Sequence, residues 1–134
     1  MQWNWTLFFI VAAAWNILLG LIGWWHPLTT MRLVFGESRD DPTMILMYRL
    51  CCSMVLIFGL GYLLVATDPA VYPGLIILGI VAKLWISGFW FYANITGRRQ
   101  WATLSSALVD TGFMLIFLMY LLRDIRGPLL AGAA

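Results

Sequence analysis

Three ionisable side chains lie inside otherwise apolar segments of the sequence: Arg49, Lys83 and Asp110. A charged side chain at the centre of a membrane-spanning helix costs about 2.5–3.5 kcal/mol on insertion scales, so such residues pair, take up water or serve a function. Two cations and one carboxylate leave a formal positive surplus, which is unfavourable in a low-dielectric layer. The surplus predicts a neutral Lys83, entry of water, or an anionic group from a ligand or a partner subunit.

The segments around these charges are long and apolar enough to cross a bilayer. Of the 134 residues, 63% are hydrophobic and 10% are charged, whereas soluble domains carry about 25% charged residues. A spanning helix needs about 20 mostly apolar residues. Four segments qualify, namely residues 5–25, 43–66, 71–93 and 102–122. The sequence therefore predicts an all-α fold, an integral membrane antiparallel four-helix bundle in a single domain 1–134, with a short tail at 123–134.

Proline and cap residues mark the ends of these spans. His26-Pro27 ends the first span, and Asp41 and Pro42 are suited to begin the second as N-cap and first helical residue. Residues 26–42 are the largest predicted loop. The first span has no basic segment before it and is longer than the core of a signal peptide, so it is predicted to be retained as a membrane helix.

Four polar side chains, one from each predicted span, fall at a similar depth. At a rise of about 1.5 Å per residue, Arg49 lies about 9 Å and Asp110 about 12 Å from the span ends nearest the first and third connections. Lys83 lies about 15 Å and Asn16 about 13 Å from that same side. We therefore expect the four residues to meet in one layer of the bundle and form a ligand-binding polar cluster.

Helical spacing adds neighbours to this cluster. Residues three, four or seven apart share a helix face, which places Ser87 with Lys83 and Ser106 with Asp110. The less specific interpretations are that Arg49 reaches the interface with its long side chain, and that Asp110 forms a structural ion pair with Arg49 or Lys83. In that case the layer would be a polar clamp that fixes helix register.

The tryptophans divide into two groups. Six of the eight lie near predicted helix ends, where indole rings favour the membrane interface. Trp15 and Trp85 lie in the middle of their spans, so we expect them to line the interior as aromatic neighbours of the polar cluster.

Several function classes have no support in the sequence. The net charge is +2, and Arg98-Arg99 is the longest basic run, which argues against nucleic-acid binding. No zinc spacing, phosphate loop or catalytic triad pattern is present, so neither a metal site nor a catalytic residue is predicted. The adjacent Cys51 and Cys52 point to different helix faces, which suits apolar packing better than a disulfide.

Loop arginines give an orientation. The first and third connections hold Arg32, Arg39, Arg98 and Arg99, against Arg123 and Arg126 in the tail. By the positive-inside rule, the first and third loops are predicted to face the cytoplasm.

Part of the chain resembles a known group. Trp15-Asn16 with Gly20, the run from Gly59 to Tyr62 before Asp68-Pro69, and the later Lys83 and Asp110 form a pattern similar to small bacterial four-span proteins of the DoxX-like type. The resemblance implies four spans and a bacterial inner-membrane location. Some relatives in that group are linked to quinone-coupled thiosulfate oxidation, but no motif here carries that activity over.

The leading hypothesis is a non-catalytic membrane protein that binds a lipophilic anionic or quinone-like ligand, or a lipid, within the helix bundle. No other cofactor is implied. Two alternatives stay open: an accessory or assembly subunit of a larger membrane complex, and a small ion-coupled transporter that acts as an oligomer with Asp110 as the carrier. The partners expected are the bilayer itself and, for the alternatives, another membrane subunit or further copies of this chain.

Overall fold

The described part of the chain is helical throughout, apart from the turns between helices. The structure is a computed structural model that describes residues 4–97 and 100–125. The elements are α1 (Trp5–Trp25), α2 (Pro27–Phe35), α3 (Pro42–Thr67), α4 (Pro73–Ile95), α5 (Trp101–Tyr120) and the π-helix η1 (Leu121–Ile125). The predicted all-α class is confirmed.

Four helices are long and apolar enough to cross a membrane, and they coincide with the predicted spans. Their most apolar stretches have a mean hydropathy between 1.7 and 2.2. Both ends of α1 match the predicted bounds, and the ends of α3, α4 and α5 lie within two residues of theirs. The last candidate span extends into the π-helix and ends at Arg123. The predicted tail from residue 126 onward lies outside the described residues.

The predicted helix starts have the expected chemistry. The Asp41 side chain accepts a hydrogen bond from Met44 N at 2.8 Å, and Pro42 follows as the first helical residue. Asn4 caps α1 in the same way, through Leu7 N at 3.0 Å. Each cap satisfies a backbone N–H that has no partner within its own helix.

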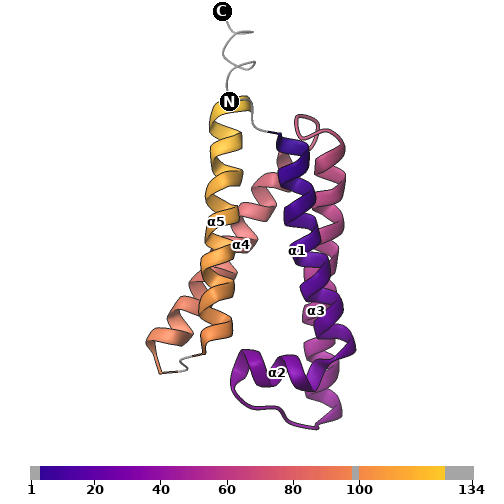
Figure 1. The fold of residues 1–134 in the computed structure, drawn as a ribbon, viewed down its shortest axis with the longest axis vertical. Coiled ribbons are helices and arrows are strands. Elements are labelled where there is room, and N and C mark those ends of the chain that lie inside the picture. Colours follow the sequence, from indigo (N-terminus) through magenta and orange to yellow (C-terminus); the bar gives the residue numbers. More distant parts are fainter. Residues whose placement is uncertain (1–3, 98–99, 126–134) are drawn as a thin grey trace, which may run out of the picture.

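Helix α2 is an element that the sequence interpretation missed. Residues 26–42 were predicted as a loop, but Pro27–Phe35 form two and a half turns of helix. Pro27 supplies a pre-set φ for the first turn, and Gly36 ends the helix in the left-handed conformation at φ 78°. Buried Pro27 and Met31 dock α2 on the rest of the chain. Figure 1 shows α2 lying crosswise at the end of the long helices.

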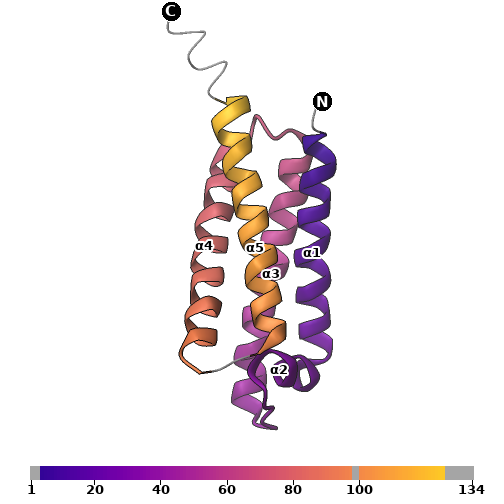
Figure 2. The same cartoon turned by 60° about the vertical axis from the view of Figure 1, so that its left-hand side comes forward.

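The long helices associate as two pairs. Helix α1 packs along α3, and α4 packs along α5 (Figures 1 and 2). Successive long helices run in opposite directions along the molecule, as Figure 2 shows. The pairs come together at the end away from α2 and diverge toward α2 in Figure 1.

Small residues allow the close approach of α1 and α3. A Cβ added to Gly59 would lie 2.7 Å from Ile17 Cγ1 and 3.2 Å from the Ala13 carbonyl oxygen. A Cβ added to Gly20 would lie 2.6 Å from Leu56 Cγ. Backbones this close need glycine at the contact, as is common between membrane helices.

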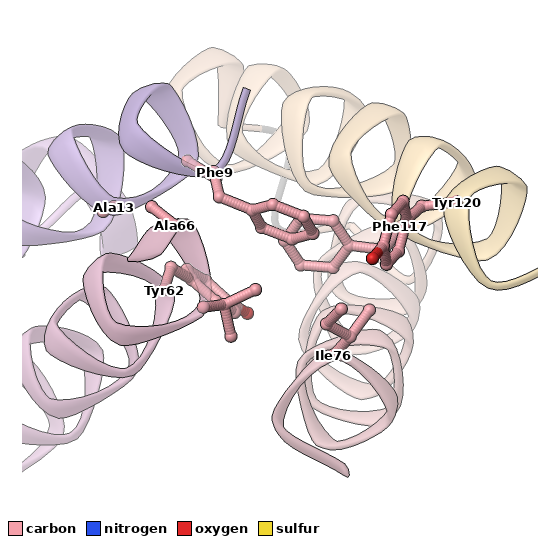
Figure 3. Close-up of a cluster of buried hydrophobic side chains, with 9 residues drawn as sticks. Phe9, Ala13, Tyr62, Ala66, Ile76, Phe117 and Tyr120 are labelled. Atoms are coloured by element: carbon pink, nitrogen blue, oxygen red, sulfur yellow. The ribbon is translucent and has the colours of Figure 1, made fainter. Parts of the chain in front are cut away.

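An aromatic cluster joins the two pairs. Phe9 of α1 stacks on Phe117 of α5 with 5.2 Å between ring centroids, and Tyr62 of α3 meets Phe117 edge-on at 5.1 Å. Ile76 of α4 and Tyr120 of α5 complete the buried group. Figure 3 shows these side chains converging from the four long helices. The cluster fixes the register of the pairs, and this register sets the level of the polar residues below it.

Candidate functional site

The centre of the candidate site is an ion pair between α4 and α5. Lys83 Nζ lies 2.5 Å from Asp110 Oδ1. The two residues are buried, with exposed fractions of 5% and 8%. A buried pair must satisfy both charges through geometry, because desolvation opposes it. The predicted partnership of Asp110 with Lys83 is present.

Aromatic rings surround the ammonium group. Lys83 Nζ lies 5.1 Å from the Phe113 ring centroid and 5.8 Å from the Tyr62 ring centroid. Both distances are within the range of cation–π attraction, which stabilises a cation in an apolar setting. Tyr62 approaches closely because Gly79 leaves room, since a Cβ there would lie 2.7 Å from the tyrosine hydroxyl. The tyrosine therefore links the α1–α3 pair to the ion pair.

Asn16 of α1 lies at the level of Asp110. The stacked rings of Phe9 and Phe117 fix the register of α1 and α5. Asn16 is seven residues beyond Phe9 and Asp110 is seven residues before Phe117, so both lie about 10 Å below the stack. Asn16 is buried, at 7% exposure.

Trp15 provides a donor without an acceptor. Its indole Nε1 is enclosed, and no described residue accepts its hydrogen. Trp15 is seven residues after Phe8, whose ring contacts Phe113 and Phe117 of α5 at 5.7 Å, so it lies on the face of α1 turned toward α5. A buried donor left without a partner costs about 1–3 kcal/mol, which makes this N–H a point where a ligand acceptor would be stabilised.

The predicted neighbours of the pair have different surroundings. Ser87 is buried, and its hydroxyl donates to the Lys83 carbonyl oxygen at 2.6 Å, so it is used within its own helix. Ser106 is half-buried, one turn from Asp110. Trp85 is 78% exposed. The prediction that Trp85 lines the interior is wrong, because it lies two residues after Lys83 and therefore points to the opposite side of α4.

Arg49 lies away from the pair. Its Nε donates to the Trp24 carbonyl oxygen at 3.2 Å, and its guanidinium lies 5.8 Å from the centroid of the Trp24 ring. Trp24 is eight residues beyond Asn16 on α1, about 12 Å lower. The expectation that Arg49 shares the level of Lys83 and Asp110 therefore does not hold. Without Arg49, the layer has one cation and one carboxylate, and the predicted surplus charge is removed.

A cavity of about 300 Å³ opens between α2 and the last turns of α4. Phe35 of α2, Trp90 of α4 and Thr103 of α5 are among its lining residues. Trp90 is seven residues beyond Lys83, so the cavity begins about 10 Å below the ion pair. Its volume is at the lower limit for small-molecule sites, which span about 300–1,000 Å³.

A second polar contact between α4 and α5 lies beside this cavity. Asn94 Nδ2 donates to Thr103 Oγ1 at 2.9 Å, and Gln100 N donates to Asn94 Oδ1 at 3.1 Å. Neither Asn94 nor Thr103 was predicted to belong to the polar cluster. The contribution of Tyr62 and Phe113 to the site was also missed, because an aromatic residue in an apolar helix carries no local signal of what it faces.

Metal-binding chemistry has no support among residues 4–97 and 100–125, where no three metal-ligating side chains lie together. Cys51 is exposed and Cys52 is buried, and both are free thiols. No family model, curated protein or solved structure matches the chain. The resemblance to DoxX-like proteins therefore stays a prediction.

Proposed function

We propose that this chain is an integral membrane protein, an antiparallel four-helix transmembrane bundle, that binds a lipophilic ligand with an acceptor-bearing head group between its two helix pairs. The ligand is bound without being chemically changed. Membrane insertion is supported by the four long apolar helices, which expose large hydrophobic side chains along their outer faces. DoxX-like membership and a bacterial inner-membrane location with cytoplasmic first and third loops are part of the same proposal.

The observation that carries the proposal is the buried indole N–H of Trp15, which has no acceptor among the described residues. It lies at the level of a buried ion pair and next to the buried amide of Asn16. A head group that accepts a hydrogen bond from Trp15 would remove the cost of the unpartnered donor. Asn16 offers both a donor and an acceptor to the same group.

The balance of charge favours an uncharged head group. The sequence left an anionic and a quinone-like head group open, and the anionic one depended on Arg49 in the layer. Lys83 and Asp110 neutralise each other, and Arg49 is bonded at the end of α1. A quinone carbonyl supplies the acceptor that Trp15 lacks without adding a charge to a dry environment. The quinone-like ligand is therefore the better fit.

We place the tail of such a ligand at the cavity between α2 and α4, which begins about 10 Å below the ion pair. Its lining combines the aromatic rings of Phe35, Phe89 and Trp90 with the threonine hydroxyl of Thr103. Apolar walls with a few polar groups are typical of small-molecule sites. With the head group at the level of Trp15, the tail of the ligand would extend toward this cavity and on to the surrounding lipid.

The test compares two tryptophan variants in the detergent-solubilised full chain, titrated with a short-chain ubiquinone by calorimetry. Trp15→Phe removes the enclosed N–H and keeps an aromatic ring, and Trp85→Phe removes an exposed one. The loss of one hydrogen bond is worth about 1 kcal/mol, so we expect Trp15→Phe to weaken binding about fivefold. Trp85→Phe is expected to bind like the wild type. Equal affinities for the two variants, or no binding to the wild type, would contradict the proposal.

A second candidate function is ion-coupled transport by an oligomer, and the buried carboxylate of Asp110 favours it. Intramembrane carboxylates paired with cations occur in proton relays. In proteoliposomes, a transporter would lose proton flux with Asp110→Asn and keep it with Asp110→Glu. A ligand-binding protein would show no flux in either case. The accessory-subunit alternative remains a prediction that native mass measurement on the purified protein would test.

A further inference from the structure

Arg49 is a cation whose donors are largely unused. Its Nε is bonded to the Trp24 carbonyl oxygen at 3.2 Å. Among the described residues, the N–H groups on Nη1 and Nη2 have no acceptor, and the ion pairs present are Lys83–Asp110 and the exposed Arg39–Glu37. A guanidinium is always charged and presents its donors as a planar fork. The fork of Arg49 is thus held in place by one bond and has no anion.

A cavity of about 350 Å³ adjoins this guanidinium at the corner between α1 and α2. Arg49, His26 and Thr29 are its polar side chains, and Trp25, Leu28 and Ile45 are among the others. Trp25 is 66% exposed and Leu28 is 37% exposed, so the apolar side of the cavity continues onto the outer surface. The cavity therefore has a positively charged side chain, Arg49, on one side and an apolar surface on the other.

The level of the cavity corresponds to the boundary of a bilayer. Helix α3 has 26 residues and is about 39 Å long, which exceeds the roughly 30 Å hydrocarbon core, whereas the 21 residues of α1 span about 31 Å. Arg49 is bonded to the last turn of α1, so its guanidinium lies where α1 leaves the hydrocarbon. Trp24 and Trp25 at the same level are the side chains expected at that interface.

From these observations we infer that the Arg49 cavity is a binding site for the phosphate head group of an anionic phospholipid. The phosphodiester accepts hydrogen bonds from the Nη1 and Nη2 groups, the arrangement in which arginine recognises phosphate. His26 at the rim supplies a further polar contact, and the acyl chains follow the exposed apolar surface of Trp25 and Leu28. The inference rests on the part of the proposed function that places the protein in a membrane. It does not depend on the quinone-like ligand or on the Lys83–Asp110 ion pair.

The position of Arg49 is set by Trp24 rather than by the lipid. The indole ring face and the backbone carbonyl of the same residue hold the guanidinium, so little side-chain freedom is lost when an anion binds. The fixed guanidinium distinguishes this site from exposed loop arginines, which attract anionic lipids only through their charge. Arg39, which is exposed on the first connection and beside Glu37, is the natural comparison.

The experiment is a lipid titration of the full chain in maltoside micelles, read as bound adducts by native mass spectrometry. The probes are dioctanoyl-phosphatidylglycerol, dioctanoyl-phosphatidylcholine and inorganic phosphate. We expect the phosphatidylglycerol to bind about tenfold more tightly than the phosphatidylcholine, because the choline ammonium neutralises the phosphate charge that attracts Arg49. Equal binding of the two lipids would overturn the inference. Inorganic phosphate binding as tightly as phosphatidylglycerol would also overturn it, because the site would then take a free anion.

Matched variants test the residue. Arg49→Gln is expected to abolish the preference for phosphatidylglycerol, Arg49→Lys to weaken it by keeping the charge without the fork, and Arg39→Gln to leave it unchanged. Equal losses with Arg49→Gln and Arg39→Gln would overturn the inference, since only net charge would then matter. If Arg49→Gln does not fold, the wild-type comparison of the three probes still decides. Ubiquinone binding to these variants is measured in parallel, so that failure of this site and of the core site are separated.

Discussion

The two helix pairs are held together by different means. At the α1–α3 interface, glycines let each helix backbone lie directly against the side chains of the facing helix. At the α4–α5 interface, the contacts that stand out are polar: the Lys83–Asp110 ion pair and the Asn94–Thr103 hydrogen bond. Lipid offers no hydrophobic driving force for helix association, so close packing and polar bonds are the two means available. The comparison indicates that close packing holds α1 to α3, whereas polar bonds hold α4 to α5.

The largest effect should come from breaking the ion pair. Lys83→Met leaves Asp110 buried without its cation, which we expect to destabilise the fold by about 3–5 kcal/mol. Steric trapping of the purified protein in bicelles would measure the free energy of unfolding. The double variant Lys83→Met with Asp110→Leu should recover most of the loss, because it removes both charges. Additive losses would show that the two residues do not act as a pair.

A smaller effect is expected from crowding the α1–α3 contact. Gly59→Ala places a methyl group 2.7 Å from Ile17 Cγ1, so the helices must shift, at a cost of about 1–3 kcal/mol. The matched control is Gly61→Ala in the same helix, where a Cβ meets nothing within 4 Å. The same unfolding measurement applies. If both variants were equally stable, close approach at Gly59 would not be what holds α1 to α3.

The smallest of these effects should come from the outer polar contact of α4 and α5. Asn94→Ala removes the bonds to Thr103 and to the Gln100 backbone, and interhelical hydrogen bonds in membrane proteins are worth about 0.6 kcal/mol on average. The control is Thr96→Ala, because the Thr96 hydroxyl bonds the Tyr92 carbonyl oxygen of its own helix. A loss with Asn94→Ala as large as with Lys83→Met would reverse the ranking of the two α4–α5 contacts.

The candidate site was predictable in part. Lys83 and Asp110 were identified because a charge in an apolar helix must find a partner, and that requirement is visible in the sequence. Their burial and pairing agree with it. Trp85 was assigned to the interior on depth alone, although its spacing of two residues from Lys83 already excluded a shared face. Arg49 was assigned by the depth of its Cα, whereas its long side chain reaches toward the end of α1.

Helix α2 was also missed, because the formation of a short helix depends on tertiary contacts that the sequence does not show. A helix of nine residues gains little from its own hydrogen bonds, so whether it forms depends on what it packs against. Pro27 was interpreted only as the end of the first span, although proline also suits the first turn of a helix, and Gly36 was not used. The burial of Met31 was not predictable, because it depends on long-range contacts.

The sequence by itself determined where the chain is apolar, where the long helices begin and end, and which charged residues need partners. These properties are local, since hydropathy, proline and cap chemistry act within a few residues of where they occur. Only the tertiary structure decided that the helices associate as two pairs, that Arg49 is separate from the ion pair and that the Trp15 N–H is enclosed without an acceptor. Those outcomes depend on the rotation of each helix about its axis and on the reach of individual side chains, and both are set by packing against residues distant in the sequence.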